Sequence, residues 1–91
     1  MNFTLSNGLA MPVVGIGTFT MTPAQAEAAV LCALTSGYRM IDTAQAYMNE
    51  RAVGRAIRKS GVARGEIFLS TKIWASQYNT EGAVEKSLEL L

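Results

Sequence analysis

The sequence predicts an α/β fold in which parallel strands alternate with helices. Three short apolar segments, starting near positions 13, 38 and 67, are each followed by a segment whose apolar residues recur at helical spacing. Strands that alternate with helices pair in parallel through crossovers of one hand, which puts every helix on one face of the sheet. The 91 residues allow at most one small domain.

Composition and charge exclude several other classes of protein. Hydrophobic residues make up 49% of the chain and charged residues 16%, a balance that excludes intrinsic disorder. A net charge of +1 supplies no basic field for nucleic acid, and the apolar runs are far shorter than a membrane span. The first ten residues lack a signal-peptide pattern, and a single cysteine suits a reducing compartment. We therefore expect a cytoplasmic protein that binds neither nucleic acid nor membrane.

An N-terminal hairpin is expected over residues 4–11. Asn7 and Gly8 are typical of a tight turn with positive φ angles. Pro12 has no N–H group for a sheet ladder and ends the hairpin. The apolar run 13–17 shows no polar alternation, which predicts a strand buried on both faces.

The first strand–helix unit spans about residues 13–37. Thr22, Pro23 and Gln25 predict the start of its helix, because Thr caps it, Pro fits the first position and Gln completes a capping box. Gly37 ends the helix. The predicted buried stripe is Ala26, Val30, Ala33 and Leu34.

The second unit spans about residues 38–61, with its strand over 38–43. Asn49 is expected to cap the helix and Gly61 to end it. The predicted buried stripe is Val53, Ala56 and Ile57.

The third unit spans about residues 67–91, with its strand over 67–72. Thr80 is expected to cap a helix with the buried stripe Val84, Leu88 and Leu91. With all helices on one face, the other face of the sheet needs cover that these residues do not contain. A (β/α)8 barrel solves this by closing on itself, with about 250 residues. We therefore expect an N-terminal hairpin and the first three strand–helix units of such a barrel, incomplete in this chain.

Gly15 and Gly17 leave alternative interpretations open. A Rossmann-type dinucleotide loop would need a third glycine where Thr20 stands, and a helix that opens earlier than Thr22. A structural turn is the second alternative. The favoured interpretation is close backbone approach at the carboxyl end of the first strand.

Asp42, Tyr47 and Lys72 are the most informative polar residues. They fall at or just after the ends of the second and third strands, and barrel enzymes place their chemistry at the carboxyl ends of the strands. An ammonium about 4 Å from a phenol favours the phenolate by at most about 4 kcal/mol at an effective dielectric constant near 20. A carboxylate would keep that ammonium charged and oriented, so the set suits protonation of a carbonyl oxygen during hydride transfer. An ordinary Asp42–Lys72 ion pair is the alternative.

Several segments resemble the aldo-keto reductases, in that family's usual order. Residues 37–44, then Glu50 and the pair 53–54, are similar to the family's first signature. Further similar segments are 5–8, 14–19 and 67–74. The resemblance covers essentially the whole chain, as the N-terminal third of a family member. It extends to small bacterial members that reduce keto-sugar acids and simple aldehydes, such as 2,5-diketo-D-gluconate reductases.

This resemblance implies an oxidoreductase that reduces aldehydes or ketones to alcohols with NADP(H) rather than NAD(H). Tyr47 would donate the proton, Lys72 would ease its release, and Asp42 would pair with Lys72. The chain departs from the family at Met40, where His or a small or polar residue is usual. It also contains no histidine, the type of the family's fourth catalytic residue. We expect the activity in the complete protein and not in this segment alone.

The resemblance also implies binding roles. Gly17, Thr18 and Asp42 would lie beside the nicotinamide end of the cofactor. Phe19 and Trp74 would form an aromatic wall around a small carbonyl substrate, with packing at the barrel mouth as the alternative.

No metal site is expected, because Cys32 has no histidine or second cysteine to complete one. The basic cluster Arg55, Arg58, Lys59 and Arg64 is interpreted as a solvated helix face. The expected partner is the remainder of the barrel or a self-association partner. The alternative function is a non-catalytic barrel fragment that binds or self-associates through its uncovered sheet face.

Overall fold

The computed structural model of the protein describes residues 2–91 and places five strands in two small sheets. The antiparallel hairpin consists of β1 (Asn2–Thr4) and β2 (Ala10–Pro12). The parallel sheet contains β3 (Ile16–Gly17), β4 (Met40–Asp42) and β5 (Phe68–Ser70), in that order. The α-helices are α1 (Pro23–Thr35), α2 (Glu50–Ser60) and α3 (Ala83–Leu90). Three short 3-10 turns are η1 (Gln45–Tyr47), η2 (Arg64–Glu66) and η3 (Ala75–Gln77).

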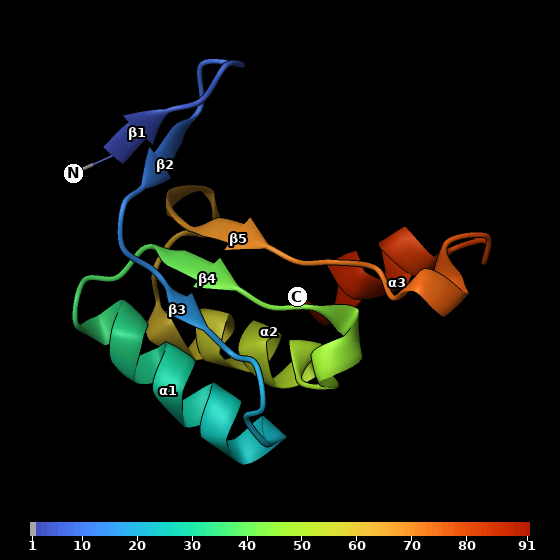
Figure 1. The fold of residues 1–91 in the computed structure, drawn as a ribbon. Coiled ribbons are helices and arrows are strands. Elements are labelled where there is room, and N and C mark those ends of the chain that lie inside the picture. Colours follow the sequence, from blue (N-terminus) through green and yellow to red (C-terminus); the bar gives the residue numbers. More distant parts are fainter. Residues whose placement is uncertain (1) are drawn as a thin grey trace.

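Helices α1 and α2 lie together against one face of the parallel sheet, as predicted (Figure 1). Consecutive strands are neighbours and run parallel, with Ile41 opposite Ile16 on one side and Leu69 on the other. The hairpin lies at the amino ends of β4 and β5, since its residues share a hollow with Arg39 and Phe68. The carboxyl ends of all three strands are therefore left free at the opposite edge.

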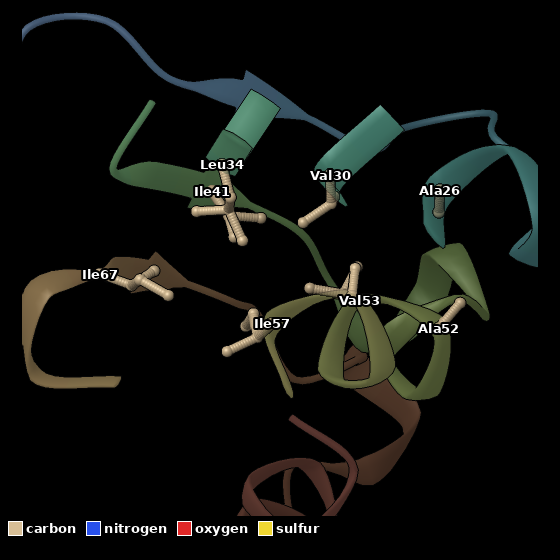
Figure 2. Close-up of a cluster of buried hydrophobic side chains, with 9 residues drawn as sticks. Ala26, Val30, Leu34, Ile41, Ala52, Val53, Ile57 and Ile67 are labelled. Atoms are coloured by element: carbon tan, nitrogen blue, oxygen red, sulfur yellow. The ribbon is translucent and has the colours of Figure 1, made fainter. Parts of the chain in front are cut away.

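The apolar core fills the layer between this sheet and the two helices (Figure 2). Its buried members are Ala26, Val30, Leu34, Ile41, Ala52, Val53, Ala56, Ile57 and Ile67. The stripes predicted for α1 and α2 are thus confirmed. Full burial of a valine, leucine or isoleucine side chain contributes about 1.5–3 kcal/mol to the free energy of folding, so this layer is the main source of stability.

The predicted start of α1 is confirmed in detail. The Thr22 hydroxyl accepts from the Gln25 N–H at 3.2 Å, and the Gln25 side chain accepts from the Thr22 N–H at 3.0 Å. Pro23 takes the first helical position, where a missing N–H costs nothing. After the helix, Gly37 adopts the left-handed conformation with φ of 103°.

The hairpin is longer than the predicted residues 4–11, because its ladder pairs Asn2 with Pro12. In the turn, Gly8 alone takes a positive φ, of 87°. Asn7 contributes differently, by accepting a hydrogen bond from the Leu9 N–H at 3.1 Å.

The strands of the parallel sheet are shorter than predicted. The run 13–17 forms only the two-residue β3, and Val13 and Val14 are 39% and 57% exposed. The prediction of a strand buried on both faces was therefore wrong. In residues 2–91, β3 pairs only with β4, so one edge of β3 stays open.

The prediction for α3 was wrong in its cap and in its buried face. Gly82, in the left-handed conformation, precedes the helix where Thr80 was expected to cap it. Ala83 and Ser87 face inward and are buried, whereas Val84 and Leu88 are 55% and 65% exposed. Neighbouring positions on a helix point in different directions, so burial of Ala83 and Ser87 turns Val84 and Leu88 outward. Leu91, the third member of the predicted stripe, is partly buried and packs against the core.

Gly54 allows the end of α3 to approach α2. A Cβ atom on Gly54 would collide with the backbone carbonyl oxygen of Leu90, so neither helix can accommodate a side chain there without moving. The glycine in the middle of α2 is therefore a packing requirement.

We expect Gly54→Ala to destabilise the protein by about 2 kcal/mol, although alanine is ordinarily the better helix former. The measurement is the free energy of unfolding in urea. Gly65→Ala is the control, since a Cβ there meets nothing within 4 Å and should change stability by less than about 0.5 kcal/mol. Equal effects of the two variants would show that α3 does not pack closely on Gly54.

One carboxylate joins α1 to α2 on the solvent side. Glu27 forms ion pairs with Lys59, at 2.7 Å, and with Arg55. Hydrogen bonds from Lys59 and Arg55 hold the pKa of Glu27 below its usual value of 4.5. Two members of the basic cluster that we interpreted as a solvated face are therefore paired.

Because the folded-state pKa of Glu27 is lowered, its contribution to stability is complete above about pH 4.5 and is lost as the pH falls through the lowered value. We expect Glu27→Gln to be less stable than the natural protein at pH 7 and equally stable in strong acid. Urea unfolding across this pH range measures the difference. Glu81→Gln is the control, as Glu81 forms no ion pair within residues 2–91.

Candidate active site

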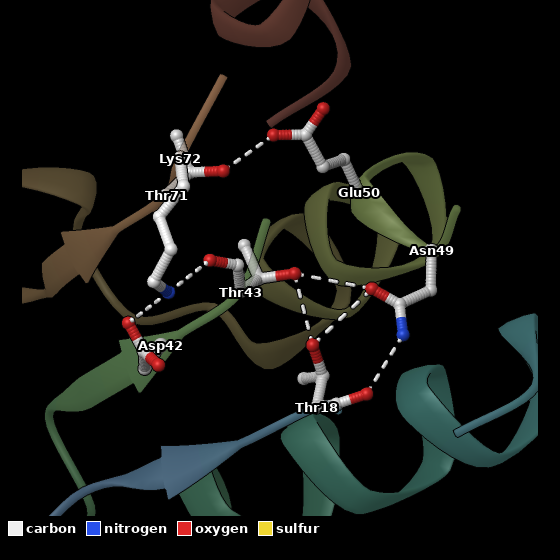
Figure 3. A network of polar contacts seen from close by, with 7 residues as sticks. All are labelled: Thr18, Asp42, Thr43, Asn49, Glu50, Thr71 and Lys72. Atoms are coloured by element: carbon white, nitrogen blue, oxygen red, sulfur yellow. Dashed lines mark hydrogen bonds and ion pairs between the residues drawn. The ribbon is translucent and has the colours of Figure 1, made fainter. Parts of the chain in front are cut away.

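Asp42, Tyr47 and Lys72 come together at the carboxyl ends of the strands. The Lys72 ammonium donates to Asp42 Oδ1 at 2.9 Å and to the carbonyl oxygen of Thr43 at 2.9 Å (Figure 3). The same nitrogen lies 5.4 Å from the centre of the Tyr47 ring. The structure thus places the three residues singled out in the sequence within one cluster.

The parallel register of the strands explains why these three side chains lie close together. Asp42 lies opposite Gly17 on β3 and Ser70 on β5, so the ends of the three strands are level. Side chains alternate across a sheet, and Ile41 is buried toward the helices, so Asp42 points to the opposite face. Lys72 follows β5 by two residues, and its ammonium reaches Asp42 at the end of β4.

The environment of Lys72 keeps it charged. Partial burial lowers the pKa of Lys72, but the hydrogen bond and the negative charge of Asp42, together with Tyr47, outweigh it and raise that pKa above its usual value. The side chains of Lys72 and Asp42 are 52% and 43% exposed, so the pair adds little to stability. Its main consequence is the fixed position of a positive charge beside a phenol.

One aromatic ring packs on Tyr47, and a second aromatic residue lies in the loop after β5. The Phe19 ring lies 5.1 Å from the Tyr47 ring, with the planes tilted by 59°. The Trp74 side chain is half exposed, and its backbone N–H donates to Gln45 Oε1 at 2.9 Å. The Gln45 N–H in turn donates to the Lys72 carbonyl at 2.9 Å. Gln45, which the sequence analysis did not single out, therefore links the loops that carry Tyr47 and Trp74.

Two of the three residues proposed for the cofactor, Gly17 and Thr18, differ in accessibility. Gly17 is exposed, and a Cβ atom there would meet nothing within 4 Å. Thr18 is fully buried, its N–H donates to the Asp42 carbonyl, and its hydroxyl lies among Thr43 and Asn49. The side chain of Thr18 is thus turned toward the helices.

Asn49 takes the predicted N-cap position of α2, but the prediction that its side chain caps the helix was wrong, because that side chain makes no capping hydrogen bond. Its carboxamide is 1% exposed and makes four hydrogen bonds inside the protein. The Nδ2 group donates to the carbonyls of Thr18 and Met21, at 2.9 and 3.2 Å. The Oδ1 atom receives the hydroxyls of Thr43 and Thr18, at 3.1 and 3.2 Å. Because these four hydrogen bonds occupy the carboxamide, it does not accept one from the backbone of its own helix.

Glu50, named in the sequence analysis only as part of the family signature, is a second buried polar residue. Its carboxylate is 3% exposed and accepts from the hydroxyls of Thr71, at 2.6 Å, and Ser87, at 3.0 Å. The available signal was a threonine at or near the end of each predicted strand, at positions 18, 43 and 71.

Residues 2–91 hold no group of three or more His, Cys, Asp or Glu side chains placed to bind a metal ion. None of the helices in this range is both long and apolar enough to cross a membrane.

The sequence matches the aldo/keto reductase family over residues 10–91. The chain belongs to the aldo-keto reductase family. It is 50% identical over 90 residues to an aldo-keto reductase of Mycolicibacterium vanbaalenii, covering 96% of this chain and 32% of that protein. It is 47% identical over 89 residues to the glycerol 2-dehydrogenase (NADP(+)) of Saccharomyces cerevisiae, covering 97% of this chain and 28% of that protein.

Among solved structures, an aldo/keto reductase of Brucella melitensis superposes with a TM-score of 0.92 at 43% identity, over 99% of this chain and 36% of that chain. The predicted fold class is confirmed: the described residues form the hairpin and the first three strand–helix units of a (β/α)8 barrel. The chain spans about a third of the length of these relatives.

Because Asp42 raises the pKa of Lys72 whereas burial lowers it, Asp42→Asn should lower that pKa. The measurement is the titration of the Lys72 13Cε resonance by NMR. Glu27→Gln removes a carboxylate that pairs with Arg55 and Lys59 and should leave the Lys72 titration unchanged. A Lys72 pKa unaffected by Asp42→Asn would show that the ion pair does not form in solution.

Proposed function

We propose that the complete protein is an NADP(H)-dependent oxidoreductase that reduces aldehydes or ketones to alcohols, with Tyr47 as the proton donor. The observation that carries this proposal is the Lys72 ammonium, held by Asp42 and the Thr43 carbonyl beside the Tyr47 ring. Membership of the aldo-keto reductases supports carbonyl chemistry. The activity is proposed for the complete protein, since this chain spans about a third of its relatives.

In this proposal the Tyr47 hydroxyl hydrogen-bonds the carbonyl oxygen of the substrate and transfers its proton as the carbon is reduced. The transfer leaves negative charge on Tyr47, which the Lys72 ammonium stabilises. Asp42 and the Thr43 carbonyl keep that ammonium charged and in place. A proton from solvent then restores the phenol.

The residues present fit a nicotinamide cofactor at this edge of the sheet. Gly17 is open and lacks a side chain, and it lies in register with Asp42, so a flat ring could approach the backbone there. Bound at this edge, the cofactor would supply hydride to the carbonyl carbon. Gly17 and Asp42 would contact it, and Thr18 would contribute by holding the backbone on which Gly17 lies. The NADP(+) in the name of the yeast relative favours NADP(H) over NAD(H).

The substrate would enter beside the exposed aromatic side chains. Phe19 and Trp74 are 68% and 51% exposed, and Phe19 lies directly against Tyr47. These two side chains would form the wall that orients a small carbonyl compound toward the phenol. We further propose that the protein acts in the cytoplasm on a small molecule, with no nucleic-acid or membrane partner.

The exposed apolar side chains of Val14, Val84 and Leu88 favour contact with the remainder of the barrel in the complete protein. A second candidate function, a non-catalytic module of 91 residues that self-associates, would use the same side chains. Size-exclusion chromatography with light scattering on the 91-residue chain distinguishes the two, since a stable monomer argues against self-association.

Tyr47→Phe in the complete protein should lower kcat for aldehyde reduction by at least about 100-fold, because the proton donor is lost. The Kd for NADPH, measured by fluorescence titration, should change by less than about twofold, since no cofactor contact is assigned to Tyr47. Tyr78→Phe is the matched control, an exposed phenol outside the cluster. Near-normal turnover of Tyr47→Phe would remove Tyr47 from the mechanism.

A further inference from the structure

The start of α2 receives hydroxyl groups from the ends of all three parallel strands (Figure 3). Thr18, Thr43 and Thr71 are the residues directly after β3, β4 and β5. The first two reach the Asn49 carboxamide, and the third reaches the Glu50 carboxylate. Two consecutive residues, the N-cap Asn49 and the first helical residue Glu50, thus hold three strand ends that lie 25 to 53 positions apart along the chain, by subtraction of their numbers.

The contacts of Thr18 and Thr43 with Asn49 are buried and that of Thr71 with Glu50 is part-buried, so their geometry is constrained. Thr18 and Thr43 are 0% exposed, and Asn49 and Glu50 are 1% and 3% exposed. The Thr43 hydroxyl accepts from Thr18 at 2.9 Å and donates to Asn49 at 3.1 Å. A buried polar group that loses its partner cannot turn to water for another, which makes displacement of any one member costly.

Lys72, Tyr47 and Phe19 of the proposed active site each lie one or two residues from a member of this network. Lys72 follows Thr71, and its ammonium donates to the carbonyl of Thr43 itself. Tyr47 precedes Asn49 by two residues, and Phe19, whose ring packs on Tyr47, follows Thr18. A shift of the network would therefore move the phenol and the ammonium relative to each other.

We propose that Asn49 and Glu50 are positioning residues of the reductase site. Asn49 sets the Tyr47 loop and the Thr43 carbonyl that receives Lys72, and Glu50 sets the strand end that carries Lys72. Neither touches the reacting atoms, and both act through the threonines. This inference rests on the proposed function, because the geometry being set is that of the proton donor.

Paired substitutions in the complete protein test the inference. Thr43→Val and Thr71→Val remove each hydroxyl with little change of shape, whereas Thr43→Ser and Thr71→Ser keep it. With benzaldehyde and NADPH as the probe, we expect the valine variants to lower kcat by about ten- to a hundredfold, the effect of a small misplacement. The serine variants should keep at least about half of kcat, and KM for NADPH should change by less than about threefold in all four.

Val53→Ala separates positioning from general loss of stability. Val53 is buried in the core, and alanine keeps the hydrogen bond from its backbone N–H to the Asn49 carbonyl. The variant should therefore unfold at lower temperature with kcat within about twofold of the natural protein. A valine variant that keeps the natural kcat would overturn the inference. So would a loss of kcat in Val53→Ala as large as in the valine variants.

A second readout does not depend on turnover. The Lys72 13Cε titration should move toward the ordinary lysine pKa in the valine variants, because the ammonium is no longer held on Asp42, and should stay unchanged in the serine variants and in Val53→Ala. The proposed function fails if the complete protein does not reduce aldehydes, or if Tyr47→Phe reduces them at the normal rate. In either case the Lys72 titration still decides whether the network positions Lys72. An unchanged titration in both valine variants would refute that positioning.

Discussion

The Asn49 carboxamide accepts from the hydroxyls of Thr18 and Thr43 and donates to the carbonyls of Thr18 and Met21. All four contacts are internal, and a lost partner would leave a buried polar group at a cost of about 1–3 kcal/mol. The ends of β3 and β4 and the start of α2 are therefore held at one point. The apolar core that includes Ile41 and Val53 packs the sheet against α2, and so brings the strand ends close to the start of the helix.

Stability and chemistry are divided between the two faces of the parallel sheet. The face toward α1 and α2 carries Ile41 and the apolar core, which supplies most of the free energy of folding. The opposite face carries Asp42, whose half-exposed ion pair with Lys72 contributes little to stability. One residue after Asp42, Thr43 turns its hydroxyl into the buried network and offers its carbonyl to Lys72, so it links the two faces.

Local backbone strain is concentrated beside the aromatic pair. Thr20 and Met48 are the non-glycine residues with positive φ in the described part of the chain, at 65° and 58°. They follow Phe19 and Tyr47 directly, and each left-handed residue costs about 1–2 kcal/mol. Such positions persist only where the surroundings over-determine them, and the Asn49 network provides that constraint on both loops.

The sequence by itself determined the features that depend on neighbours along the chain. The capping box at Thr22, the buried stripes of α1 and α2, and the parallel order of the strands follow from residue type and spacing. The cluster of Asp42, Tyr47 and Lys72 was also predictable, because parallel strands bring their carboxyl ends to one edge. The tertiary structure alone decided that Asn49 leaves its expected capping role, since its four partners belong to other elements. It likewise decided which face of α3 is buried, because the seat of that helix depends on Gly54 and Glu50 in α2 rather than on its own pattern of apolar residues.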